Sequence, residues 1–132
     1  MGDVKGFSGI ERASLLFGED DMPRRMTRWE QMVDKHWGEV MNTFTYRGLD
    51  ARNILEPKVQ QLCAIAALTM INAVAPLKTH IKCAFRAGAT DAEIKEAILQ
   101  TTRYCGLPFV NSAFVVYEDV ARERGTSNEA KQ

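Results

Sequence analysis

The segment from Leu62 to Ile71 constrains the fold of this chain more than any other stretch. It reads L-C-A-I-A-A-L-T-M-I, so apolar residues occupy nearly every position around a helix. A helix of that kind is buried on all sides. A chain of 132 residues can hardly cover it alone. We therefore expect a buried helix, opened by Pro57 and reaching about Val74, in a subunit that forms an oligomer.

The N-terminal part of the chain also carries helical signals. A first helix is expected over Ile10 to Phe17, where Gly18 stops it. A long second helix is expected to open at Pro23, because the apolar residues from Met26 to Phe44 keep a spacing of three to four. Tyr46 to Leu55 is expected to be a connection.

The C-terminal part predicts further helices. Pro76 marks the start of one that ends at Gly88, a common left-handed position after a helix. The string T-D-A-E at residues 90–93 is a capping box, and it predicts a helix that runs to about Arg103. Gly106 breaks this helix, and a last one is expected over residues 108–123.

Together these signals predict an all-α fold of six helices, with no alternating strand pattern anywhere. Both ends of the chain are small, polar or charged, and are expected to be loose. The expected organisation is a flexible N-terminus over 1–9, a single helical domain over 10–123 and a flexible C-terminus over 124–132.

Charge and hydropathy exclude several classes of partner. Seventeen basic residues balance seventeen acidic ones, without the basic excess that phosphate backbones require, so no nucleic-acid partner is expected. The longest mostly apolar stretch, 62–77, falls short of the roughly 20 residues of a membrane span. Residues 1–7 lack the apolar core of a signal peptide. We expect a cytoplasmic protein with no membrane partner.

The cysteines predict neither a disulfide framework nor a metal site. Cys63, Cys83 and Cys105 are odd in number and widely spaced, with no C-x-x-C. A zinc site would have to combine these scattered cysteines with the two histidines. We expect no metal and no organic cofactor.

Three strings carry a resemblance to a known family. Residues 56–68 read E-P-K-V-Q-Q-L-C-A-I-A-A-L, residues 79–98 read T-H-I-K-C-A-F-R-A-G-A-T-D-A-E-I-K-E-A-I, and residues 101–114 read T-T-R-Y-C-G-L-P-F-V-N-S-A-F. These resemble the carboxymuconolactone decarboxylase and alkyl hydroperoxidase D superfamily. The last string, together with L-F-G-E-D-D-M-P-R at 16–24 and W-G-E-V at 37–40, is similar to the decarboxylase branch in particular.

The resemblance implies an all-helical, alkyl hydroperoxidase D-like subunit that assembles into trimers or hexamers, with active sites near subunit contacts. The peroxidase branch carries C-x-x-C, a histidine four residues later, and a glutamate on the preceding helix. Here these positions hold Ala73, Pro76, His80 and Gln61, so only the histidine is kept. A dithiol–disulfide cycle needs two neighbouring thiols. The resemblance therefore favours the decarboxylase.

That reaction acts on a small carboxylated lactone and needs no cofactor, because the conjugated lactone is its own electron sink. The protein must hold two carboxylates, stabilise an oxyanion and deliver a proton. His80 is the natural proton donor, since histidine titrates near neutral pH, and it could equally polarise the lactone oxygen. The alternative is a histidine that only bonds neighbouring backbone.

Four further residues are candidates for catalysis. Cys83 shares a helix face with His80, as a second active-site group or, more often, as a small buried hydrophobe. Tyr104 could donate a hydrogen bond to an oxyanion, while the adjacent Cys105 could also simply pack. Glu39 of the W-G-E string could orient His80 or act as an acid, although surface glutamates are common.

Four residues are candidates for binding substrate. Arg103 is the preferred carboxylate clamp, because it adjoins Tyr104 in an apolar context and arginine binds carboxylates bidentately. Arg47 is a second cation of this kind, and Trp37 and Asn111 match the family pattern. Two alternatives to a decarboxylase remain open: a thiol-dependent peroxidase or disulfide reductase of the same fold, and a non-catalytic oligomeric binding protein.

Overall fold

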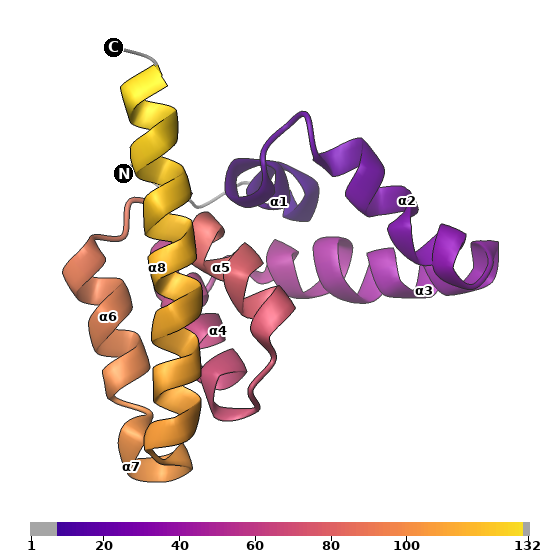
Figure 1. Cartoon of the computed structure of the whole chain (residues 1–132). Helices are drawn as coiled ribbons and strands as arrows, with labels where there is room; N and C mark the ends of the chain where they lie inside the picture. Colours follow the sequence, from indigo (N-terminus) through magenta and orange to yellow (C-terminus); the bar gives the residue numbers. More distant parts are fainter. Residues whose placement is uncertain (1–7, 131–132) are drawn as a thin grey trace. The chain divides into compact units, whose positions relative to one another are not determined.

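The computed structural model describes residues 8–130, and in this range the chain forms helices and no strand (Figure 1). The all-α expectation is thus confirmed for the described residues. The contacts group the chain into two compact units, residues 1–57 and residues 58–132. The expected single domain over 10–123 stays a prediction.

The helices of the first unit are α1 (Gly9–Phe17), α2 (Met22–Met32), α3 (Lys35–Phe44), the π-helix η1 (Thr45–Leu49) and the 3-10 helix η2 (Asp50–Arg52).

Helix α1 begins and ends as the sequence predicts. The Ser8 hydroxyl accepts a hydrogen bond from the Glu11 backbone N–H at 3.1 Å. The Glu11 carboxylate in turn accepts from the Ser8 N–H at 2.7 Å, which completes a capping box. Gly18 follows the last residue with φ of 95°, a backbone angle that favours glycine.

The prediction of one long second helix is wrong, because two separate helices, α2 and α3, occupy this segment. Val33 and Asp34 leave the helical region, with φ of −132° and −165°. The Asp34 carboxylate accepts a hydrogen bond from the Trp37 N–H at 2.8 Å and so caps α3. The apolar spacing continues through this break, which explains why periodicity alone missed it.

Two glycines allow close packing inside the first unit. A Cβ on Gly38 would lie 2.8 Å from the Glu30 Cβ, so glycine lets α3 approach α2 at this point. A Cβ on Gly9 would lie 1.5 Å from the Tyr46 carbonyl oxygen, which no side chain could occupy. The start of α1 therefore rests directly on the backbone of η1.

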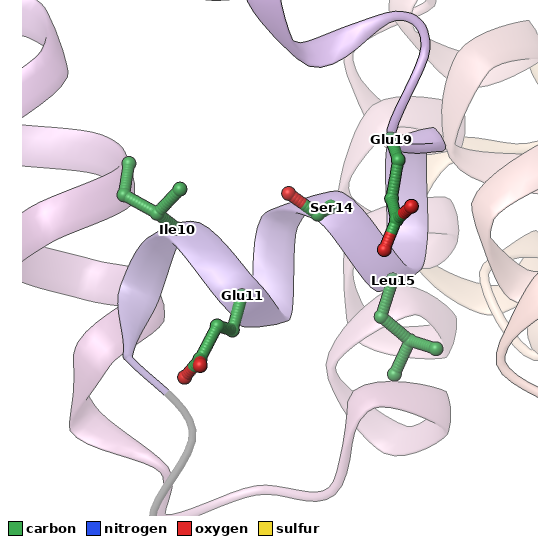
Figure 2. Close-up of a pocket in the computed structure, with 5 residues that line it drawn as sticks. All are labelled: Ile10, Glu11, Ser14, Leu15 and Glu19. Atoms are coloured by element: carbon green, nitrogen blue, oxygen red, sulfur yellow. The ribbon is translucent and has the colours of Figure 1, made fainter.

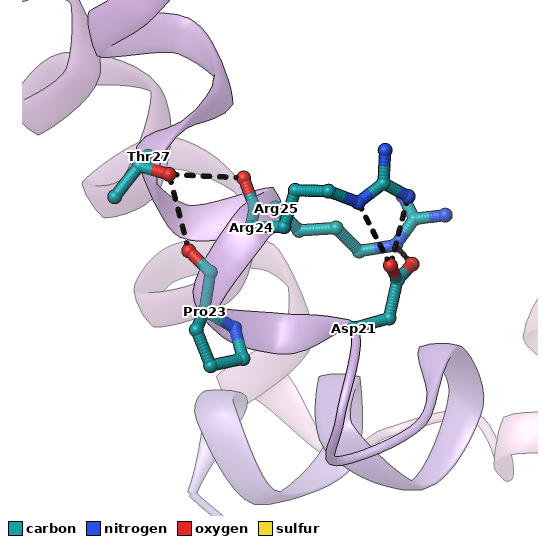
Figure 3. Close-up of polar contacts among 5 residues, drawn as sticks. All are labelled: Asp21, Pro23, Arg24, Arg25 and Thr27. Atoms are coloured by element: carbon teal, nitrogen blue, oxygen red, sulfur yellow. Dashed lines mark hydrogen bonds and ion pairs between the residues drawn. The ribbon is translucent and has the colours of Figure 1, made fainter.

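A polar cluster fixes the first turn of α2 (Figure 3). The Asp21 carboxylate accepts hydrogen bonds from Arg24 and Arg25, each with a shortest distance of 2.8 Å. The Thr27 hydroxyl donates to the Pro23 and Arg24 carbonyls at 3.2 and 3.1 Å. The Arg25 guanidinium also lies over the Phe17 ring, 4.2 Å from its centroid, and ties α2 to α1.

The expected connection over Tyr46 to Leu55 contains the two short helices η1 and η2 and then Asn53 in the left-handed region, with φ of 53°. Arg12 of α1, only 2% exposed, anchors this segment. Its guanidinium donates to the Asn53 side-chain oxygen at 3.1 Å and to the Leu55 carbonyl oxygen. Burial lowers the pKa of Arg12, and the nearby charge of Asp50 opposes that effect.

The second unit contains the helices expected from the C-terminal signals, with two changes. The helix expected to run to Arg103 ends at Leu99, where the Thr101 N–H bonds the carbonyl of Ile98, three residues back, and a short separate helix follows. The last helix extends to Ala130, beyond the expected end near Glu123. The bounds are α4 (Pro57–Met70), α5 (Val74–Arg86), α6 (Asp91–Leu99), α7 (Thr102–Cys105) and α8 (Leu107–Ala130). With the break after α2 and the separate α7, the described residues hold more α-helices than the six expected.

The core of this unit lies between α8 and the shorter helices packed on it (Figure 1). The buried apolar residues include Ile65, Ile81, Ile94, Ile98 and Val120, each 0% exposed. The capping box at Thr90 and Glu93 starts α6 as predicted. Helices α5 and α8 are also joined at the surface, where Glu123 accepts from Lys78 at 2.7 Å and pairs with Lys82 at 3.1 Å. The next residue, Arg124, lies over the Phe85 ring at 3.5 Å.

Helix α4 buries one face within its own chain. Gln61, Ile65 and Thr69 are 2% exposed or less, whereas Val59 and Met70 are each 39% exposed. A single chain therefore does not bury α4 on all sides, as the sequence predicted. The oligomer that would cover the exposed side of α4 stays a prediction. None of the described helices combines the length and apolar character needed to cross a bilayer.

Candidate functional site

His80 lies in the middle of α5, partly buried, with the fully buried Ile81 beside it. Its ring nitrogen Nδ1 lies 2.7 Å from the side-chain oxygen Oε1 of Gln61, on α4. This contact joins two residues 19 positions apart on consecutive helices. It is a side-chain hydrogen bond between a predicted site residue and a buried polar residue.

The geometry of this contact determines where the ring carries its proton. An amide oxygen accepts hydrogen bonds and cannot donate them, so a hydrogen bond to Gln61 Oε1 requires a proton on Nδ1. Gln61 is buried beside Ile65 and Thr69 on the same face of α4, and the Thr69 hydroxyl donates to the Ile65 carbonyl at 2.8 Å.

The two candidate cysteines, Cys83 and Cys105, differ in their surroundings. Cys83, one turn after His80 on α5, is 0% exposed. Cys105, at the end of α7, is partly buried against the core, and its thiol lies 3.6 Å from the Thr101 hydroxyl. Both environments are those of small packing residues. Their predicted catalytic roles stay predictions.

Three other candidates of the second unit lie on its surface. Arg103 is exposed on α7, the adjacent Tyr104 is 69% exposed, and Asn111 is exposed on α8. The side chains of Arg103 and Tyr104 are thus open to a ligand or to another subunit.

The remaining candidates belong to the first unit. Trp37 and Glu39 are exposed on α3, and Arg47 is exposed on η1. Glu39 lines a surface hollow of about 460 Å³ together with His36, Val40, Thr43 and Phe44. The structure therefore brings Glu39 near the second histidine of the chain, which the sequence analysis left without a role.

A second hollow, of about 510 Å³, lies along α1 (Figure 2). Glu11, Ser14 and Glu19 supply its polar lining, and Ile10 and Leu15 supply its apolar lining. The Glu11 carboxylate already caps the start of α1. The lining of this hollow contains no candidate from the sequence analysis and no cation that would bind a carboxylate.

Tyr117 of the second unit has a strongly raised pKa. Burial first, and then a hydrogen bond donated to the Asp91 carboxylate, raise the pKa of Tyr117 to about 12. The phenol packs beside Phe85 and under Lys95. This arrangement fastens the start of α6 to α8 and gives the phenol a structural role.

His80 stays a predicted catalytic residue, and its contact with Gln61 is not predicted by the sequence. The sequence pattern marks Gln61 only as the position where the peroxidase branch has a glutamate. A polar residue among the apolar residues of this helix is nevertheless a signal, because buried polar side chains need a hydrogen-bond partner. Over the described residues, His, Cys, Asp and Glu side chains form no group of three or more able to hold a metal ion.

Comparison with known proteins identifies the family. Residues 37–119 match the Carboxymuconolactone decarboxylase family. The chain is 26% identical over 121 residues to the 4-carboxymuconolactone decarboxylase of Acinetobacter baylyi, covering 92% of this chain and 90% of that protein. It is 36% identical over 83 residues to an uncharacterized 15.0 kDa protein in the nqo9-nqo10 intergenic region of Paracoccus denitrificans, covering 61% of this chain and 58% of that protein. The matched range includes α4 and α5, with Gln61 and His80, and the chain therefore belongs to the carboxymuconolactone decarboxylase family.

Proposed function

We propose that this protein is a cofactor-free decarboxylase of the cytoplasm, acting on a small carboxylated lactone of the 4-carboxymuconolactone type in the breakdown of aromatic compounds. The likeness to the Acinetobacter protein supports the substrate class, since it extends over 92% of the chain. The residues of α5 support the reaction class. The peroxidase cysteine positions are Ala73, at the start of α5, and Pro76, in its first turn, so the dithiol chemistry has no thiols there.

The observation that carries the proposal is the hydrogen bond between His80 and Gln61. A proton donor must present a defined nitrogen to the reacting carbon. Because Nδ1 is held by Gln61 at 2.7 Å, the imidazolium form of His80 presents its second N–H, at Nε2.

The proposed reaction has two steps. First, the bond between the lactone ring carbon and its carboxylate breaks, carbon dioxide leaves, and the electron pair moves through the conjugated ring onto the lactone carbonyl oxygen. His80 Nε2–H stabilises this oxyanion or stands ready as the acid. Second, the Nε2 proton passes to ring carbon and restores the carbonyl, which leaves a neutral imidazole that solvent protonates again.

Binding of the two substrate carboxylates requires cations near His80. Arg103, exposed on α7, is the proposed clamp in the second unit, with Asn111 as a hydrogen-bonding neighbour. Tyr104, exposed beside Arg103, is the proposed donor to the oxyanion. Trp37, Glu39 and Arg47, exposed on the first unit, stay candidates from the sequence pattern.

We further propose that the active protein is a homo-oligomer, a trimer or a hexamer. Large apolar side chains are exposed on α4, α7 and α8, among them Met70 at 39%, Tyr104 at 69% and Leu107 at 58%. Subunit contacts that cover such side chains would also exclude water from the proposed clamp on α7.

The test is turnover of freshly generated 4-carboxymuconolactone, followed by ultraviolet absorbance, with His80→Gln and His36→Gln compared with the unchanged protein. His36→Gln is the matched control, because it makes the same chemical change at the exposed histidine of α3. We expect His80→Gln to lower kcat by about 10² to 10⁴-fold, the usual contribution of a general acid, and His36→Gln to leave it unchanged.

Two outcomes would contradict the proposal. If the unchanged protein does not decarboxylate the lactone, the substrate class is wrong. Turnover of an alkyl hydroperoxide with a dithiol reductant would then indicate the thiol chemistry instead. If His80→Gln and His36→Gln are equally active on the lactone, decarboxylation does not use His80.

A further inference from the structure

We propose that Gln61 is the positioning residue of the site: its amide oxygen holds the Nδ1–H of His80 in both protonation states and directs all proton exchange to Nε2. This inference rests on the proposed function and goes further, because it explains why an amide, rather than a carboxylate, occupies this position.

The geometry gives Gln61 a fixed place from which to act. The side chain is 2% exposed, and the next turn of α4 places Ile65, 0% exposed, in the core of the second unit. The next residue after His80, Ile81, is also 0% exposed and holds the backbone of α5 in the core. Both partners of the 2.7 Å contact are thus anchored by buried residues on their own helices. The ring therefore has little freedom to turn away.

The chemistry of the amide makes this contact insensitive to the charge of the ring. A glutamine oxygen accepts from Nδ1–H whether the imidazole is neutral or protonated, and it does not titrate itself. A carboxylate in the same place would attract the imidazolium and hold its proton more tightly. With Gln61, the neutral ring keeps Nδ1–H, so the proton that is lost and regained is always the one on Nε2.

Two substitutions separate these effects. Gln61→Met keeps the length of the side chain and removes the acceptor. Gln61→Glu keeps the shape and an acceptor oxygen but adds a negative charge. Gln60→Met is the matched control, since it makes the same change one residue away on α4 at a partly buried position.

The first measurement is independent of activity. The chain has two histidines, so ¹⁵N-histidine labelling gives two imidazole spectra, and the His36→Gln variant assigns them. In the unchanged protein and in Gln60→Met we expect neutral His80 to carry its proton on Nδ1. In Gln61→Met we expect a mixture with a large share of the Nε2–H form, which an isolated imidazole side chain favours. In Gln61→Glu we expect His80 to stay doubly protonated to a pH higher by about 1 to 3 units.

The second measurement is turnover of the lactone. Gln61→Met is expected to lower kcat by about 10- to 100-fold with little change in KM, because the loss of one buried hydrogen bond frees the ring without removing the acid. Gln61→Glu is expected to move the pH profile of kcat toward higher pH, because the carboxylate holds the imidazolium proton more tightly, whereas a merely structural glutamine would leave the profile where it is.

The inference is overturned if His80 keeps the Nδ1–H form in Gln61→Met, or if Gln61→Glu titrates as the unchanged protein does. Should Gln61→Met fail to fold by circular dichroism, the titration of the isosteric Gln61→Glu decides alone. The spectra stay decisive even if the lactone is not a substrate, so failure of the proposed function and failure of this inference are distinguishable.

Discussion

Replacing glycine by alanine at Gly9, Gly38 and Gly125 tests how closely backbones approach one another in this fold. The same methyl group is added each time, and only its surroundings differ. At Gly9 the new Cβ would lie 1.5 Å from the Tyr46 carbonyl oxygen, where ordinary contact begins at 3.4 Å. The start of α1 and the η1 backbone would have to separate by about 2 Å, and backbone shifts of that size cost about 3 kcal/mol or more of unfolding free energy.

The other two positions predict much smaller effects. At Gly38 the Cβ would lie 2.8 Å from the Glu30 Cβ and 3.1 Å from the Glu30 backbone nitrogen, so α2 and α3 need to part by only a few tenths of an ångström. The strain of about 1 to 3 kcal/mol is partly offset by the better helix propensity of alanine, about 1 kcal/mol. At Gly125 nothing lies within 4 Å, and alanine should stabilise the protein by about 0.5 to 1 kcal/mol.

Urea unfolding followed by far-ultraviolet circular dichroism measures all three values on one scale. The expected order of stability is Gly125→Ala above the unchanged protein, then Gly38→Ala, and then Gly9→Ala by a wide margin. If Gly9→Ala were less destabilising than Gly38→Ala, or cost under about 1 kcal/mol, the close approach of α1 to the Tyr46 carbonyl would not be part of the folded state.

Two further predictions concern buried polar groups. Because burial and the hydrogen bond to the carboxylate at the start of α6 raise the pKa of Tyr117 from 10.0 to about 12, the folded chain holds this proton more tightly than the unfolded chain. The resulting stability is fully present below pH 10.0 and is lost as the pH rises toward about 12, so urea midpoints should fall more steeply over this range than those of Tyr117→Phe. Arg12→Ala should lower the unfolding free energy by about 2 to 4 kcal/mol, since it removes a buried side chain together with the donors to Asn53 and Leu55. The control Arg24→Ala, at an ion pair 72% exposed on the arginine side, should change it by less than about 1 kcal/mol in the same urea assay.

Local signals in the sequence predicted the elements whose ends depend on local chemistry. The capping box at Thr90 and the glycines at Gly18 and Gly88 place helix ends where the structure has them, because each acts through its own backbone within one turn. The break at Asp34 was missed for a related reason. The Asp34 cap is also a local signal. The apolar periodicity, however, continues in phase from α2 into α3, and it favoured the prediction of one continuous helix.

The site could be predicted only in part. A family string marks His80, whereas the pairing of His80 with Gln61 depends on how α4 packs against its neighbours, and no local pattern encodes that. The exposure of Tyr104 is likewise a tertiary property, which the apolar sequence around it does not reveal. Burial of α4 on all sides was inferred from composition, and one chain covers only the face of Gln61, Ile65 and Thr69.

The attachment of α8 to α5 has a consequence for how this protein can be shortened or fused. Glu123 forms ion pairs with Lys78 and Lys82, and the Arg124 guanidinium lies over the Phe85 ring. Two consecutive residues of α8 thus contact α5, the helix that carries His80. A chain truncated before Glu123 would lose both the ion pairs and the cation–π contact. A chain truncated or fused after Gly125 would keep them. The useful boundary for a tag or a fusion partner thus lies inside a continuous helix and not at its end.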